Sequence, residues 1–174
     1  LSNDISGAFY GMNLYNLTAP VLLDNQISAY RHTGINFSSN RGAAQIKRNN
    51  VKGTGYYALN FGSHTAGTQR AVVATNYLSC SSIGWGYAMQ ISSSPDVDVY
   101  FNTFRMLSPS SSAYGFYLSG NSSGLSYVNN LAQSASGYAA VFATPENLLR
   151  RDHNLFYSES GIAVKYGSTD INTL

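Results

Sequence analysis

The sequence predicts an all-β protein built from stacked repeats. Three observations support this fold class. An asparagine motif recurs along the chain, large residues alternate with other residues between its copies, and charged residues make up only 10% of the 174 residues. Recurrence at a fixed period is typical of a repeat protein, in which neighbouring repeats bury a shared core.

The asparagine motif reads apolar, x, x, Asn, x, apolar. Clear copies occupy residues 22–27, 46–51, 73–78 and 99–104, and weaker copies occupy 126–131 and 151–156. The aligned asparagines are Asn25, Asn49, Asn76, Asn102, Asn129 and Asn154. They are separated by 24 to 27 residues, which predicts about six coils.

The second signature is a glycine followed by alternating large residues. It begins at Gly11, Gly34, Gly55, Gly86, Gly115 and Gly161. Alternation with a period of two indicates strands with one buried face. Each repeat is therefore predicted to contain about three short strands and no helix.

Leucine-rich repeats also contain apolar-x-apolar-x-x-Asn-x-apolar, and VDVYFNTF, from Val97, matches that string. However, those repeats continue with several leucines at helical or turn spacing. Here the corresponding interval reads SSIGWGYAMQIS, which is rich in Gly and Ser and alternates as a strand does. The leucine-rich fold is therefore excluded.

The pattern resembles the right-handed parallel β-helix of the pectin-lyase-like superfamily, with PbH1-type repeats, over residues 5 to 166. In that fold each coil has three strands and an inward asparagine at a tight turn. The resemblance implies an internal asparagine ladder. Asn tolerates the left-handed conformation that such a turn needs, so we expect the ladder asparagines to adopt it.

The repeat predicts one continuous β-helix segment over residues 1–174. Because the sequence starts at Leu1 without Met, we expect it to be a piece of a longer protein. The single Cys80 excludes an internal disulfide framework and is expected to be buried. No apolar run is long enough to span a membrane. We expect the open solenoid ends to contact flanking domains or other copies of the chain.

One outward column is predicted from the motif, at Leu23, Lys47, Ala74, Tyr100, Tyr127 and Asp152. Adjacent coils lie about 4.8 Å apart, so Lys47, Tyr100 and Tyr127 would meet successive sugars of an extended glycan. The alternative is that the tyrosines only stabilise the sheet face.

The N-terminal half is locally basic. It has no Asp or Glu from residue 25 to residue 95, but it contains Arg31, Arg41, Lys47, Arg48, Lys52 and Arg70, with His32 and His64. This favours an acidic polysaccharide as partner, with loop solvation as the alternative. A net charge of +2 argues against nucleic acid.

Enzymes that resemble this fold include uronate lyases and polygalacturonase-like hydrolases. A lyase needs a base and a cation, for which Lys47, Arg48, Tyr100, Arg150, Arg151 and His153 are available, but no lyase signature is present. The Asn-Thr-Asp, Asp-Asp and Gly-His-Gly strings of the hydrolases are absent. Asp96 and Asp98 are too few for calcium. Catalytic residues are therefore unassigned, and no metal or cofactor is expected.

At the C-terminal end, DHNLFYSESGIAVKYGS, from Asp152, resembles the closing segment of bacterial secreted β-helix proteins. Arg151 stands where earlier motifs have an apolar residue, so either the register shifts or the stack ends there. Arg150, Arg151 and His153 are a second candidate binding cluster, with solvated capping charges as the alternative. We therefore expect a secreted or cell-surface protein with a structural or adhesive role that binds polysaccharide. The competing hypothesis is a polysaccharide lyase.

Overall fold

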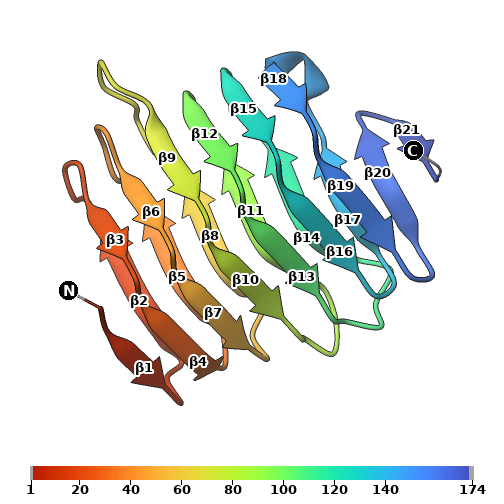
Figure 1. Cartoon of the computed structure of the whole chain (residues 1–174), viewed down its shortest axis with the longest axis horizontal. Helices are drawn as coiled ribbons and strands as arrows, with labels where there is room; N and C mark the ends of the chain where they lie inside the picture. The colour runs from red at the N-terminus through yellow and green to blue at the C-terminus, as the bar shows by residue number, and fades with distance from the viewer. Residues whose placement is uncertain (1, 173–174) are drawn as a thin grey trace.

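The computed structural model describes residues 2–172 and shows a parallel β-solenoid (Figure 1). The chain winds through three sheets in turn, and each strand pairs in parallel with the equivalent strand of the next coil. The first sheet has seven strands, so the stack has seven coils instead of about six. The extra coil is N-terminal, where Asn3 already joins the ladder.

The three sheets run the length of the solenoid. The first sheet contains β1 (Asp4–Ser6), β4 (Gln26–Tyr30), β7 (Asn50–Gly53), β10 (Tyr77–Cys80), β13 (Thr103–Met106), β16 (Leu131–Ser134) and β19 (Leu155–Ser158). The second contains β2 (Tyr10–Tyr15), β5 (Thr33–Ser38), β8 (Tyr57–Gly62), β11 (Gly86–Ser92), β14 (Ala113–Ser119), β17 (Tyr138–Phe142), β20 (Ile162–Tyr166) and β21 (Thr169–Ile171). The third contains β3 (Val21–Leu23), β6 (Gln45–Lys47), β9 (Ala71–Ala74), β12 (Val97–Tyr100), β15 (Leu125–Val128) and β18 (Leu148–Asp152). The helical structure in the described residues is one 3₁₀ turn, η1 (Pro145–Asn147).

The core lies inside the three sheets, where like residues stack along the axis. Phe37 lies on Phe61 with ring centroids 4.7 Å apart, and Phe104, Phe116 and Phe142 continue the aromatic interior. Each inward residue packs against its equivalent one coil away because the parallel register repeats along the stack. Cys80 is buried in this core, as predicted, and burial raises the pKa of its thiol.

The turn between the third and first sheets is the most regular feature of the fold. It always has two residues, for example 24 and 25 between β3 and β4, or 101 and 102 between β12 and β13. The first residue is left-handed and the second is the ladder asparagine. The left-handed positions are Asp24, Arg48, Thr75, Phe101, Asn129 and His153. Our expectation that the ladder asparagines themselves adopt this conformation was therefore wrong.

The predicted asparagine ladder is present, with one correction. Each asparagine donates its backbone N–H and its Nδ2 to the Oδ1 of the next; for Asn76 to Asn102 these distances are 3.0 and 2.9 Å. In the fifth coil the rung is Asn130, which accepts from Asn102 and donates to Asn154. Asn129, which the motif predicted, is exposed and occupies the left-handed position. The motif also fits one residue later, as Tyr127-x-x-Asn130-x-Ala132, and the structure adopts this alignment, so the predicted alignment was one residue early.

A second polar row lines the turn between the second and third sheets. Asn40 accepts the backbone N–H of Leu17 at 2.8 Å, and the backbone N–H of His64 donates to Ser94 Oγ at 3.0 Å. Ser122 Oγ in turn accepts the backbone N–H of Ser94. These side chains replace water as partners of buried backbone groups.

The two ends of the solenoid differ. At the N-terminal end, a hollow of about 220 Å³ is lined by core residues, among them Met12, Leu14 and Leu22. At the C-terminal end, β21 pairs antiparallel with β20 and covers the edge of the second sheet. Arg151 lies over the ring of Tyr166, 4.2 Å from its centroid. Arg151 pairs with the inward Tyr127 and lies in β18, the last strand of the third sheet. Both alternatives for Arg151 are therefore seen, because the register shifts between Leu125 and Ser126 and the third sheet ends at β18.

Candidate functional site

The outer face of the second sheet carries a column of tyrosines. Tyr57, Tyr87, Tyr114 and Tyr138 occupy equivalent positions in β8, β11, β14 and β17. Their ring centroids lie 5.3, 5.1 and 5.6 Å apart in sequence, with planes inclined by 10 to 14°. The column exists because the same residue type recurs at one register position of a parallel sheet.

Stacking determines which part of each ring meets solvent. The inner members, Tyr87 and Tyr114, have a tyrosine on each side, so they present ring edges and phenolic hydroxyls. Burial and the neighbouring phenols raise the pKa of Tyr87 to about 12. Burial also raises the pKa of Tyr57 and Tyr114. These hydroxyls therefore stay protonated, and able to donate hydrogen bonds, at neutral pH.

A second aromatic row lies beside this column, at the turns that lead into the second sheet. Phe9, His32, Tyr56 and Trp85 follow one another with centroids 4.5 to 5.4 Å apart. Trp85, the only tryptophan of the chain, stacks on Tyr56 and is 45% exposed. This row gives the edge of the sheet a broad, partly exposed aromatic surface.

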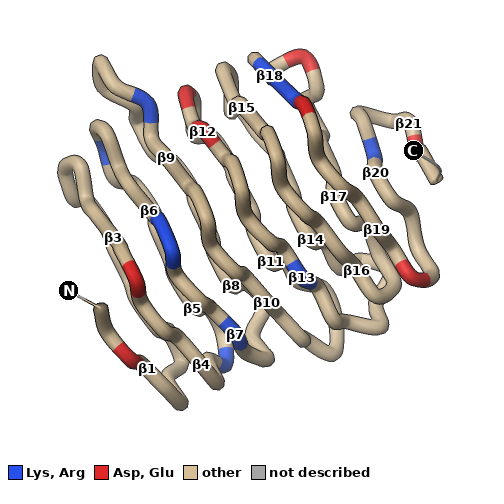
Figure 2. Tube along the Cα trace, in the orientation of Figure 1, with Lys and Arg blue, Asp and Glu red and all other residues tan. Residues whose placement is uncertain are grey.

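Uncharged polar side chains flank the tyrosines on the other side. Asn13, Asn36 and Asn60 form an external amide column, linked by bonds of 2.8 and 2.9 Å, and Gln90 follows in register. The six strands from β2 to β17 in this sheet contain no Asp, Glu, Lys or Arg. The first charged side chain along the sheet is Lys165 in β20 (Figure 2). We call this surface, the tyrosine and amide columns with the Trp85 row, the aromatic face.

A groove of about 510 Å³ adjoins the C-terminal part of the aromatic face. Tyr114 and Tyr138 contribute to its lining, together with serines from three successive coils and four further residues. The serines are Ser111, Ser112, Ser136 and Ser160, and the further residues are Gly137, Gly161, Ile162 and Asn172. Its lining has no charged side chain. Such a surface can bind a hydroxyl-rich, uncharged molecule through hydrogen bonds and contacts with ring edges.

The predicted outward column on the third sheet is present in part. Lys47 and Tyr100 occupy the same column, two coils apart with Ala74 between them. Lys47 donates to Gln45 at 3.0 Å. Tyr127 was wrongly assigned, because Val128 takes that position and Tyr127 is fully buried in the core. The cause is the same one-residue misalignment of the motif that predicted Asn129 in place of Asn130 as the rung.

The other predicted binding residues lie apart from one another. Arg48 is held by Asp24 through two bonds of 2.6 and 2.7 Å, and this contact lowers the pKa of Asp24. Arg150 and His153 both approach Asp152, at 3.5 and 3.0 Å. Arg151 instead lies over the ring of Tyr166 at the end of the solenoid. Arg150, Arg151 and His153 therefore do not form one site.

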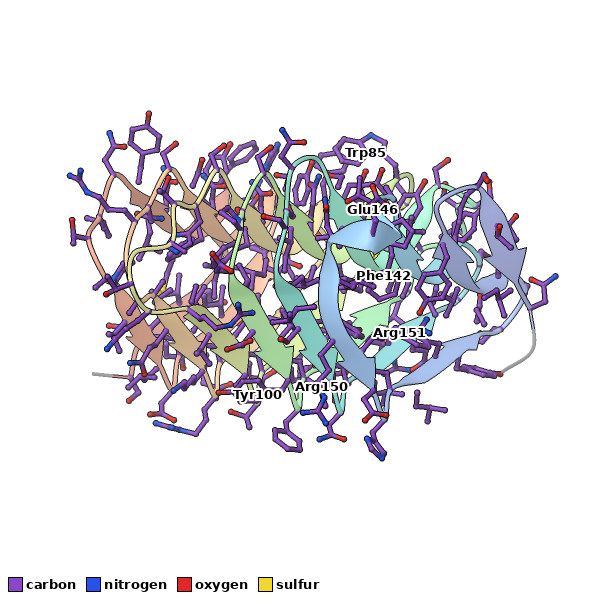
Figure 3. The ribbon with its side chains drawn as sticks, turned by 90° about the horizontal axis from the view of Figure 1, so that it is seen from above. Trp85, Tyr100, Phe142, Glu146, Arg150 and Arg151 are labelled. Carbon is purple, nitrogen blue, oxygen red and sulfur yellow. The ribbon has the colours of Figure 1, made fainter. Side chains whose placement is uncertain are left out.

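A hollow of about 370 Å³ on the third sheet brings Tyr100 and Arg150 together. Its lining residues are Asp98, Tyr100, Phe101, Ser126, Val128, Asn129 and Arg150. Tyr100 and Arg150 project from the opposite side of the solenoid to Trp85 (Figure 3). We call this the Tyr100 hollow.

Arg70 contacts both Asp96 and Asp98, the closely spaced carboxylates that were considered for calcium. Its guanidinium donates to Asp98 at 2.8 Å and to Asp96 at 3.2 Å, and it also bonds the carbonyl of Gly124. Both carboxylates therefore form ion pairs with Arg70. Among residues 2–172, no three His, Cys, Asp or Glu side chains lie close enough to hold a metal ion.

The basic residues of the N-terminal half are spread around the solenoid. Lys47 lies on the third sheet, and Lys52 lies on the first, where its Nζ is 5.0 Å from the ring of Tyr77. Arg41 and Arg70 lie in turns, bonded to Thr18 and to Asp98 respectively. The strands and turns therefore assemble no single basic patch from them.

The sequence contained a signal for the tyrosine column that our interpretation missed. Tyr-small-large recurs in three successive coils, as Tyr57-Ala-Leu, Tyr87-Ala-Met and Tyr114-Gly-Phe, and the next coil has Tyr138-Ala-Ala. The outward column was instead predicted from the asparagine motif, which lies at the end of the third sheet, so the candidate surface was placed there. Among the described residues, no helix is long and apolar enough to cross a membrane. Comparison of the chain with protein-family models, curated proteins and solved structures finds no match.

Proposed function

We propose that this protein is a structural or adhesive segment of a secreted or cell-surface protein and that it binds polysaccharide through the aromatic face. The observation that carries the proposal is the aromatic face itself, where aromatic, amide and hydroxyl groups recur coil after coil and Lys165, with its Nζ 5.5 Å from the ring centroid of Tyr138, lies at the C-terminal end. The architecture resembles that of the pectin-lyase-like superfamily, but fold alone does not imply function.

The repeat of the face suits an extended polymer. Coils of a parallel sheet recur about every 4.8 Å, so equivalent groups on successive coils can meet successive units of a chain that runs along the axis. Aromatic surfaces suit the C–H faces of sugars, while the amides and phenols exchange hydrogen bonds with sugar hydroxyls. Since the six strands from β2 to β17 carry no charge, the face favours a neutral polysaccharide over an acidic one.

Trp85 provides a direct test of this proposal because it is the only tryptophan and lies in the aromatic face. We expect its fluorescence to change when soluble neutral polysaccharides, such as cello-, xylo- and galacto-oligosaccharides, are titrated into the protein. Trp85→Ala and Tyr56→Ala should weaken binding, measured by calorimetry, by about tenfold or more. Tyr157→Ala is the matched control, because Tyr157 is 52% exposed but lies on the first sheet. Equal binding by all four proteins would contradict the proposal.

A polysaccharide lyase is the second candidate function, favoured by Tyr100 and Arg150 in one hollow. A phenol could act as the base and a guanidinium could neutralise the uronate. Incubation with pectin or alginate should then produce the ultraviolet absorbance of unsaturated uronates. If absorbance does not increase and the aromatic face binds polysaccharide, the lyase is refuted and the adhesive role is the one candidate that remains.

A further inference from the structure

We propose that the Tyr100 hollow is a second binding site, separate from the aromatic face, and that it takes an anionic sugar unit. The lyase candidate above uses the same hollow, but this inference requires binding alone, without catalysis, and it does not depend on the neutral polymer proposed for the second sheet. The inference begins with Phe101, whose position in the fold is unusual.

Phe101 occupies the left-handed position of the turn between the third and first sheets, with φ of 57°. In the other coils this position holds Asp24, Arg48, Thr75, Asn129 and His153, all polar. A bulky side chain in this backbone region is strained, whereas Asn is tolerated there. Phe101 gains little from packing in return, because it is 58% exposed. An exposed apolar residue at a strained position indicates a role other than stability.

The surroundings of Phe101 indicate what it contacts. Its ring meets that of Tyr100 edge to face, with centroids 5.8 Å apart and an interplanar angle of 84°. The two rings form an aromatic corner in the hollow, which Asn129 and Ser126 complete with polar groups. An aromatic corner with adjacent amide and hydroxyl groups suits a sugar ring, which has an apolar face and a polar edge.

The charge available in the hollow is positive. The carboxylate of Asp98 is already engaged by Arg70 at 2.8 Å. Arg150 is 63% exposed, and its contact with Asp152, at 3.5 Å, is longer than a strong charge-assisted hydrogen bond. Exposed pairs of this kind contribute little, so the guanidinium can turn to a ligand. Guanidinium groups bind carboxylate and sulfate in a bidentate manner, which makes a uronate or a sulfated sugar the matching ligand.

Calorimetric titration with oligogalacturonate tests the proposal. The variants are Phe101→Asn, which copies the residue of the next coil, and Arg150→Gln, which keeps the size but removes the charge. Each should lower the affinity at least tenfold. Salt should weaken binding to the parent and to Phe101→Asn, but not to Arg150→Gln. Tyr157→Ala is the control and should bind oligogalacturonate as the parent does, because Tyr157 is exposed but lies on the first sheet and does not line the hollow.

Stability measurements complete the test. Phe101→Asn should unfold at the same temperature as the parent or higher, because the strain is relieved. A binding defect in a variant that is equally or more stable assigns Phe101 to the site. The proposal is overturned if the parent binds oligogalacturonate no better than a neutral galacto-oligosaccharide, if Phe101→Asn binds normally, or if Phe101→Asn is less stable, since Phe101 would then be structural.

Discussion

Two adjacent asparagines of the fifth coil test the ladder at single-residue resolution. The changes are Asn130→Ala, which removes a rung, and Asn129→Gly, which alters the exposed left-handed residue beside it. Asn130 Oδ1 accepts both the backbone N–H and the Nδ2 of Asn102, each at 3.0 Å. Asn130 Nδ2 donates to the carbonyls of Val99 and Val128, at 2.9 and 3.1 Å.

The cost of Asn130→Ala can be estimated from these contacts. The Asn102 amide keeps its bonds to two carbonyls, but its buried backbone N–H loses its acceptor. An orphaned buried donor costs about 1 to 3 kcal/mol, and the lost carbonyl bonds add about 1 kcal/mol. We therefore expect the free energy of unfolding to fall by about 2 to 4 kcal/mol. Asn129→Gly should change it by less than about 0.5 kcal/mol, because glycine adopts a positive φ without strain.

Urea denaturation of the two variants and the parent gives the measurement. The midpoint of Asn130→Ala should shift at unchanged slope, since the change in exposed surface on unfolding stays the same. Similar midpoints for the two variants, or a larger loss for Asn129→Gly, would refute the assignment of Asn130 as the rung.

Three further predictions follow from individual side chains. Burial lowers the pKa of His64, so the unfolded chain binds more protons than the folded chain as the pH falls below about 6.5. The free energy of unfolding should therefore decrease over that range. His64→Asn, which copies Asn40, should remove this pH dependence in denaturation curves recorded from pH 7 to 5. The hydroxyl of Tyr127 is buried and has no hydrogen-bond partner among the described residues; Tyr127→Phe should therefore raise the unfolding free energy by about 1 kcal/mol, and a loss would reveal a partner. Arg151→Ala should lower it by about 0.5 to 1 kcal/mol, through loss of the contact with Tyr166, whereas an unchanged thermal midpoint would argue that the guanidinium merely lies in solvent.

The sequence was sufficient for the fold because the same constraint recurs in every coil. A rung asparagine must lie between apolar residues, so the motif at Asn25, Asn49, Asn76 and Asn102 predicts the turn and both neighbouring strands. It failed at Asn129, where two asparagines stand together and either satisfies the pattern. The choice depends on whether Val128 or Tyr127 faces the core, which is a question of packing that spacing alone does not answer.

The candidate site was predicted less well because binding surfaces lack such a constraint. An outward tyrosine can belong to a stacked column or to a binding face, and alternation alone does not distinguish them. Tyr100 was placed correctly on the third sheet, but its partner Arg150 was expected in a cluster with Arg151 and His153. The bulge between Leu125 and Ser126 in the pairing of β15 with β18 changes the register there, and no periodic signal marks it.

The turn that carries the ladder asparagine has two residues in all six of its occurrences. This constant length limits how such a protein can change in evolution. The turns into the second sheet vary in length, with residues 31–32 as the shortest and residues 107–112 as the longest. Loops there can therefore lengthen without disturbing the stack. At the asparagine turn a single insertion would move a rung out of line with both neighbours. Because each rung makes the same contacts to the coil before and after it, a whole coil can be gained or lost at once. Descendants of this chain should therefore differ in coil number and in loop length at the other two edges, while the asparagine edge keeps its form.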